Sequence, residues 1–214
     1  MPYLLYCVTD DTAELDPAVR GVQGEAVESM VHAKLRCFYS ALDAVGAGLE
    51  TQKREALEFH QVTRSLLAQG TIIPFRFPTV LPGLTEIGAH LEARGQAYNA
   101  ALHQLRNMVQ MEIRIELVDR ETPVASSGTQ YLKNLAHNSR CMENAVATCR
   151  ATINELVIDF QQREFSYGVR CFVLIKREAV QQFRDQIKQI RLERSTKAAV
   201  SGPWPPTEFF PDFA

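Results

Sequence analysis

The chain has 214 residues, of which 46% are hydrophobic and 22% are charged, and its formal net charge at pH 7 is −2. This size and composition are typical of a folded protein with one large domain or two small ones, and they exclude an intrinsically disordered chain. The small net charge argues against binding to nucleic acid or to an anionic membrane surface, because both require an excess of basic residues.

The cysteines indicate a reducing compartment. Five are spread along the sequence without any Cys-x-x-Cys pair: Cys7, Cys37, Cys141, Cys149 and Cys171. Free, buried thiols in the cytoplasm explain this usage better than disulfides or a zinc site. The sequence shows no signal-peptide pattern and no apolar run near the ~20 residues that a transmembrane helix needs. We therefore expect a cytoplasmic protein without a membrane span.

The first half of the chain predicts a mixed α+β domain. Tyr3–Val8 is an apolar run that turn residues end, as in a central strand. The runs 27–31 and 33–40 predict a hairpin, and the alternation in the second run is typical of a half-buried strand. Apolar residues then recur at helical spacing over 51–70, where Gly70 ends the helix, and again over 84–105.

Between these two helices, the stretch 69–80 has the composition of a short strand buried between two layers. Alternation places Ile73, Phe75 and Phe77 on one face and Ile72, Pro74 and Arg76 on the other. Pro74 has no N–H group, which indicates an edge strand or a bulge. Arg76, if covered, needs a carboxylate or carbonyl partner, and a structural tether is a simpler role for it than ligand binding.

The second half predicts a ferredoxin-like α+β sandwich. Residues 111–117 alternate as a strand, and a polar loop over 119–128 follows. A heptad seam then indicates a long amphipathic helix packed on a sheet, or a helical hairpin. The seam consists of Leu135, Met142, Cys149 and Leu156, with Val146 and Ile153 between them. A hairpin over 158–175, a helix over 180–190 and a strand over 197–200 complete the ferredoxin-like order.

The predicted organisation is an amino-terminal mixed α+β domain of modified ferredoxin-like type (1–107), a carboxy-terminal ferredoxin-like domain (108–201) and a tail (202–214). The tail contains Gly202, Pro203, Trp204, Pro205, Pro206 and Phe209. Its prolines fix an extended path that side-chain contacts must hold. We favour a strap on its own chain, with Trp204 as the anchor, over a recognition segment that docks on another subunit.

No catalytic motif is present. The sequence lacks G-x-S-x-G, G-x-x-x-x-G-K-[ST], G-x-G-x-x-G and H-E-x-x-H, which mark common hydrolases, nucleotide-binding proteins and zinc proteases. No two histidines are three or four residues apart, and no pair of carboxylates is placed for acid–base catalysis. We expect no enzymatic activity, metal or cofactor. The alternative is an enzyme or small-ligand sensor on a ferredoxin-like scaffold, with His60 and Arg76 at a pocket.

Several patches of the sequence carry a further signal. They are Tyr3–Tyr6, the block from His60 through Pro74, Arg76 and Phe77 to Val80, Gly128 with Tyr131 and Leu132, Tyr167–Arg177, and Gly202–Pro206 followed by Phe209. In this order, and over nearly the whole chain, they resemble the gas vesicle accessory protein family GvpF/GvpL. The Gly-Pro-Trp-Pro-Pro string is the most specific of them. These motif positions are the candidate interaction residues.

The resemblance implies a non-catalytic part in the assembly of gas vesicles, the hollow protein-walled buoyancy compartments of some microbes. It implies a two-domain α+β fold and contacts with the small hydrophobic shell protein GvpA and with other accessory proteins. A shell subunit that polymerises through apolar surface needs a partner that covers this surface or seeds its growth. The contact candidates are the 84–105 helix, the outer face of the 135–156 helix and Trp204, although internal packing explains their apolar residues equally well.

Overall fold

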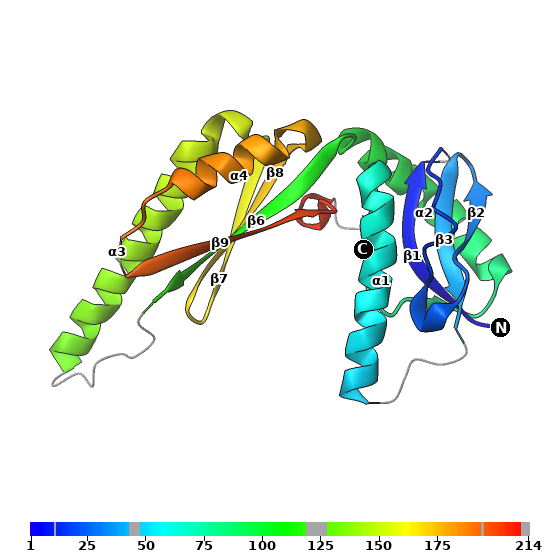
Figure 1. Ribbon diagram of the computed structural model, residues 1–214, viewed down its shortest axis with the longest axis horizontal. Coiled ribbons are helices and arrows are strands. Elements are labelled where there is room, and N and C mark those ends of the chain that lie inside the picture. Colours follow the sequence, from blue (N-terminus) through cyan, green and yellow to red (C-terminus); the bar gives the residue numbers. More distant parts are fainter. Residues whose placement is uncertain (11, 43–47, 119–127, 194, 211–214) are drawn as a thin grey trace. The chain divides into compact units, whose positions relative to one another are not determined.

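A computed structural model describes residues 1–10, 12–42, 48–118, 128–193 and 195–210 (Figure 1). The chain divides into two compact units, which we call unit 1 and unit 2. Unit 1 combines Met1–Asn107 with the segment that begins at Trp204, and unit 2 is Met108–Pro203. Each unit contains a β-sheet and helices, so the predicted α+β class is confirmed. Short 3₁₀ turns occupy Val22–Gly24, Asn154–Leu156, Arg177–Ala179 and Thr207–Phe209.

The sheet of unit 1 is built around β1 (Tyr3–Asp10), the predicted central strand. β3 (Leu35–Ala41) pairs with one side of β1 and forms a hairpin with β2 (Glu28–His32), as predicted. β4 (Ile73–Pro74) and β5 (Val80–Leu81) pair with the other side of β1. All four of these pairings are antiparallel.

Helices cover both faces of this sheet. They are α1 (Leu49–Gln69) and α2 (Leu84–Gln104), and each lies where its periodicity predicted a helix. In β3, Phe38 packs in the cluster that contains the apolar residues of α1, whereas Cys37 packs in the cluster that contains those of α2. The prediction that this strand is half-buried is therefore wrong, because a second helix covers the face that was expected to meet water.

Unit 2 has the strand, helix, hairpin, helix, strand order that the sequence predicted. Its elements are β6 (Met108–Leu117), α3 (Gly128–Ile153), β7 (Asp159–Phe165), β8 (Gly168–Lys176), α4 (Val180–Gln189) and β9 (Thr196–Trp204). The sheet order is β7-β8-β6-β9, so the first and last strands of the unit are neighbours, as in ferredoxin-like sandwiches. Both helices pack on the sheet in one hydrophobic cluster. A loop was predicted over 119–128, but residues 119–127 lie outside the described part of the chain.

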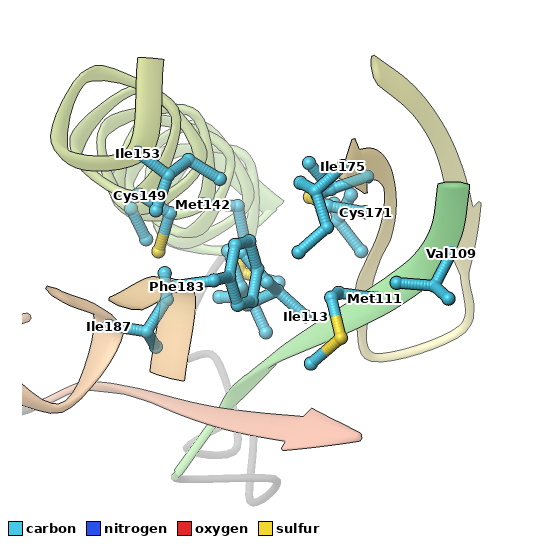
Figure 2. Packing of buried hydrophobic residues seen from close by; sticks show 14 residues of the cluster. Val109, Met111, Ile113, Met142, Cys149, Ile153, Cys171, Ile175, Phe183 and Ile187 are labelled. Carbon is cyan, nitrogen blue, oxygen red and sulfur yellow. The ribbon is translucent and has the colours of Figure 1, made fainter. Parts of the chain in front are cut away.

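This hydrophobic cluster holds α3 and α4 on the sheet (Figure 2). The members that Figure 2 labels are Val109, Met111 and Ile113 of β6, Cys171 and Ile175 of β8, Met142, Cys149 and Ile153 of α3, and Phe183 and Ile187 of α4. Phe183 is completely buried among side chains from the other elements. The heptad seam is therefore packed on a sheet from Met142 onward, whereas Leu135, its first predicted position, is 44% exposed. Among the described residues, no helix combines the length and the apolar character needed to cross a membrane.

Candidate interaction site

The stretch between α1 and α2 is an interrupted edge strand. After β4, the Phe75 N–H donates a hydrogen bond to the Tyr6 carbonyl oxygen over 2.9 Å. Pairing with β1 resumes where the Leu5 N–H donates to the Thr79 carbonyl oxygen, also over 2.9 Å, and continues into β5. Pro74 lies at the sheet edge, as its missing N–H predicted. A cis peptide bond joins Phe77 to Pro78 between the two parts.

The predicted alternation along this stretch is wrong at Phe77. Ile73 and Phe75 pack in the cluster of α2, as expected, but Phe77 packs with Ile72 in the cluster of α1. There the Phe77 ring lies 5.4 Å from the Phe59 ring, centroid to centroid. The alternation fails because the regular strand ends at Pro74, and a period of two holds only while the backbone stays pleated.

Arg76 and His60 lie in different surroundings. The Arg76 side chain is exposed and needs no buried partner, and its carbonyl oxygen accepts a hydrogen bond from Thr79 Oγ1 (2.5 Å). His60 is half-buried on α1, and its ring centroid lies 5.2 Å from that of Trp204. His60 therefore packs against the tail, whereas the Arg76 side chain faces solvent.

The tail packs on its own chain from Gly202 onward. In unit 2, Arg184 Nη2 donates to the Gly202 carbonyl oxygen over 2.6 Å. In unit 1, Phe209 is 8% exposed, and Phe210 packs against the cluster of α2. Pro206 is buried, and the other motif residues, Pro203, Trp204 and Pro205, are half-buried. These contacts are those of a strap.

Gly202 occupies a backbone position that suits glycine alone. Its φ is +110°, in the region that L side chains rarely adopt. A Cβ atom there would lie 2.9 Å from the Gln110 carbonyl oxygen and 3.1 Å from Met111 Sδ, both on the neighbouring strand β6. The first residue of the Gly-Pro-Trp-Pro-Pro string thus has a structural explanation.

A groove of about 1380 Å³ lies between α3 and the turn that joins β7 to β8. Leu135, Met142 and Val146 line it from α3, and Phe165 and Tyr167 line it from the turn. Exposed hydrophobic side chains gather at or beside it: Val118 (49% exposed), Leu132 (65%), Leu135 (44%) and Tyr167 (55%). The remaining motif residue, Tyr131, lies in the first turn of α3, and its side chain lies outside the described part of the chain.

All five cysteines are free and buried, as predicted. Burial raises the pKa of Cys37 and of Cys171 to about 12 and that of Cys149 to about 11, and it raises the pKa of Cys7 well above its ordinary value. These thiols are poor nucleophiles near neutral pH, because the thiolate is the reactive form.

Cys141 has polar neighbours that were not predicted from the sequence. The four-residue spacing between His137 and Cys141, which places both on one face of a helix, could have indicated the first of them. The Cys141 Sγ atom lies 3.6 Å from His137 Nε2 and donates to Glu193 Oε2 over 3.3 Å. Within the described ranges, no three His, Cys, Asp or Glu side chains are arranged to hold a metal ion.

Comparison with known proteins decides the family. The family described as "Gas vesicle synthesis protein GvpL/GvpF" matches residues 3–211 of the sequence. The chain belongs to this family. GvpL/GvpF membership confirms the resemblance found in the sequence and gives the protein a role connected with gas vesicles. No protein with a curated description matches the sequence.

Solved GvpF structures share the fold. The gas vesicle protein GvpF from Anabaena sp. PCC7120 aligns with a TM-score of 0.79 and 13% identity, over 98% of this chain and 96% of that one. GvpF from Microcystis aeruginosa aligns with a TM-score of 0.77 and 13% identity, over 98% of this chain and 99% of that one. At this identity, the likeness concerns the fold.

Proposed function

We propose that this protein takes part in gas vesicle assembly by binding the hydrophobic shell protein GvpA, which it nucleates or chaperones without catalysis. The observation that carries the proposal is the family match over residues 3–211. Binding takes place in the cytoplasm, at the growing vesicle, and other accessory proteins join the same assembly. Burial raises the pKa values of Cys37, Cys149 and Cys171, so the proposal assigns no nucleophilic role to these thiols.

We assign the shell contact to the surface around Trp204. The helix α2 is a weaker candidate, because Ile87, Leu91 and Tyr98 direct its apolar stripe into the core of unit 1. Trp204 is only half-buried, so part of its indole ring remains available to a partner. Large aromatic side chains contribute strongly to protein interfaces because they bury much apolar area with few rotatable bonds.

The test is a pull-down with purified GvpA-type shell protein. Native protein should capture the shell protein, and Trp204→Ala should capture much less while keeping its circular dichroism spectrum. Val31→Ala is the control, because it removes an apolar side chain that is 53% exposed on β2, outside both the tail and the groove. If Trp204→Ala captures as much shell protein as the native protein does, the assembly role stands, but the tail only packs against its own chain and does not contact the shell protein. No capture by the native protein would refute the assembly role.

The sensor or enzyme alternative placed His60 and Arg76 together at one pocket. Arg76 is exposed, and His60 packs on Trp204. Neither residue lines the groove on unit 2.

A further inference from the structure

The amino-terminal half of α3, residues 128–140, lies outside the core of unit 2. The hydrophobic cluster beneath the helix begins at Met142, and Figure 1 shows the helix continuing past the strands of the unit. These residues form a rod of roughly 20 Å, and a free helix of that length is only marginally stable in water. A helix that projects in this way gains stability when a second surface packs against it.

The exposed side of this half continues the seam that is buried further along. Counting back in heptads from Met142 gives Leu135, and counting back from Val146 gives Ser139 and then Leu132. Leu135 is 44% and Leu132 65% exposed, whereas Met142 is 9% exposed. One apolar seam therefore runs along the whole helix, and the sheet covers only its carboxy-terminal part.

The groove beside this seam is lined by two carboxylates and one arginine, whereas the charged residues of the projecting half are all basic. Glu143 and Glu164 line the groove, and Arg150, the groove's arginine, lies over the Phe160 ring at 5.0 Å. The projecting half carries Lys133 and Arg140, both with exposed side chains. Ten residues of helix, roughly 15 Å, separate Lys133 from Glu143, so the two cannot pair within one chain. The projecting half thus has the charge and the apolar seam that the groove accepts.

We propose that two copies of this chain form a symmetric dimer, in which the amino-terminal half of each α3 lies antiparallel in the groove of the other copy. Such an interface is isologous, because each copy supplies the same helix and the same groove. A helical rod about 10 Å wide and 15 Å long occupies roughly 1200 Å³, close to the volume of the groove. Leu132 and Leu135 of one copy then meet Met142, Val146 and Tyr167 of the other. This pairing is separate from shell binding at Trp204.

The first test is the molar mass of the purified protein in solution, measured by light scattering or sedimentation over a range of concentrations. The native protein should change from monomer to dimer as its concentration rises. The double variant Leu132→Ser, Leu135→Ser should dissociate at least about tenfold more readily, because it loses apolar burial at the centre of the interface. Leu57→Ser, which changes a leucine that is 69% exposed on α1, is the control and should dimerise like the native protein.

The second test separates pairing from folding by exchanging charges. One variant carries Lys133→Glu with Arg140→Glu, and the other carries Glu143→Lys with Glu164→Lys. Each variant alone should remain monomeric, since like charges then face each other, whereas an equimolar mixture should dimerise. Circular dichroism confirms that each variant is folded.

Three results would overturn the proposal. One is a native protein that stays monomeric at the highest concentration reached. Another is a charge-exchanged mixture that pairs no better than its two components. The third is a leucine double variant that keeps its dimer but loses capture of the shell protein, because the seam would then belong to the shell contact.

Discussion

Replacing Gly202 by alanine tests whether the first position of the Gly-Pro-Trp-Pro-Pro string requires glycine for structural reasons. Alanine at a φ of +110° is strained, which costs roughly 1–3 kcal/mol. The new Cβ atom also approaches the Gln110 carbonyl oxygen at 2.9 Å and the Met111 Cα atom at 3.3 Å. Both are backbone atoms of β6 and cannot move aside as a side chain can, so overpacking adds roughly 1–3 kcal/mol. We expect Gly202→Ala to lower the free energy of unfolding by roughly 2–6 kcal/mol.

Two other alanine variants separate these contributions. Gly24 has a φ of +78° with no atom within 4 Å of an added Cβ, so Gly24→Ala should show backbone strain alone, roughly 1–2 kcal/mol. Gly88 lies inside α2, also with no atom within 4 Å, so Gly88→Ala should stabilise by roughly 0.5–1 kcal/mol through helix propensity.

The assay is urea unfolding, followed by far-ultraviolet circular dichroism and by the fluorescence of Trp204. Coincident transitions from the two probes would permit a two-state analysis of each variant. The expected order of stability is Gly88→Ala, native, Gly24→Ala, Gly202→Ala. A Gly202→Ala protein as stable as Gly24→Ala would refute the steric part of the argument, and one as stable as the native protein would refute it entirely.

Three further predictions concern buried and half-buried groups. Phe183→Ala removes a completely buried ring and should lower the free energy of unfolding by about 3–5 kcal/mol in urea titrations; a loss below about 1 kcal/mol would contradict the packing in Figure 2. The five thiols should react slowly with a disulfide reagent in the native protein and rapidly in urea, because all are buried; equal rates would show that they are accessible. Burial, and to a lesser extent the charge of Arg94, lower the pKa of His90 below its ordinary 6.5. The stability that neutral His90 contributes is therefore full above pH 6.5 and is lost as pH falls through the lowered pKa. His90→Gln should flatten the decline in the free energy of unfolding from about pH 7 to about pH 5, and an unchanged slope would exclude His90 as the source of that decline.

Elements with a strong period could be predicted from the sequence. The spacing of the apolar residues placed a helix over 84–105, and α2 spans Leu84–Gln104. The last strand was predicted over 197–200 but extends over Thr196–Trp204 as β9, because Pro203 is tolerated on the outermost strand of a sheet. A pattern of side chains indicates which face of a strand is apolar, but tertiary packing decides whether the polar face is covered as well, as at Phe38.

The candidate sites were less predictable. Composition singled out the 69–80 stretch, yet the interruption after Pro74 reversed the face on which Phe77 packs. The heptad seam of α3 was visible in the sequence, but the point at which the sheet ceases to cover it depends on the ends of β7 and β8, which no local pattern encodes. The groove and its exposed leucines therefore became apparent only in three dimensions.

The division of unit 1 into two separate chain segments affects how the protein emerges from the ribosome. Residues 108–203 are synthesised before Trp204, so unit 2 has all its strands and helices while unit 1 still lacks Phe209 and Phe210. Domains generally fold in the order of synthesis, but here the amino-terminal unit is the last to become complete. During that interval, the part of the α2 cluster that Phe210 covers stays open to solvent or to chaperones. A premature stop codon just after unit 2 would therefore destabilise unit 1, although most of unit 1 is encoded far upstream of that codon.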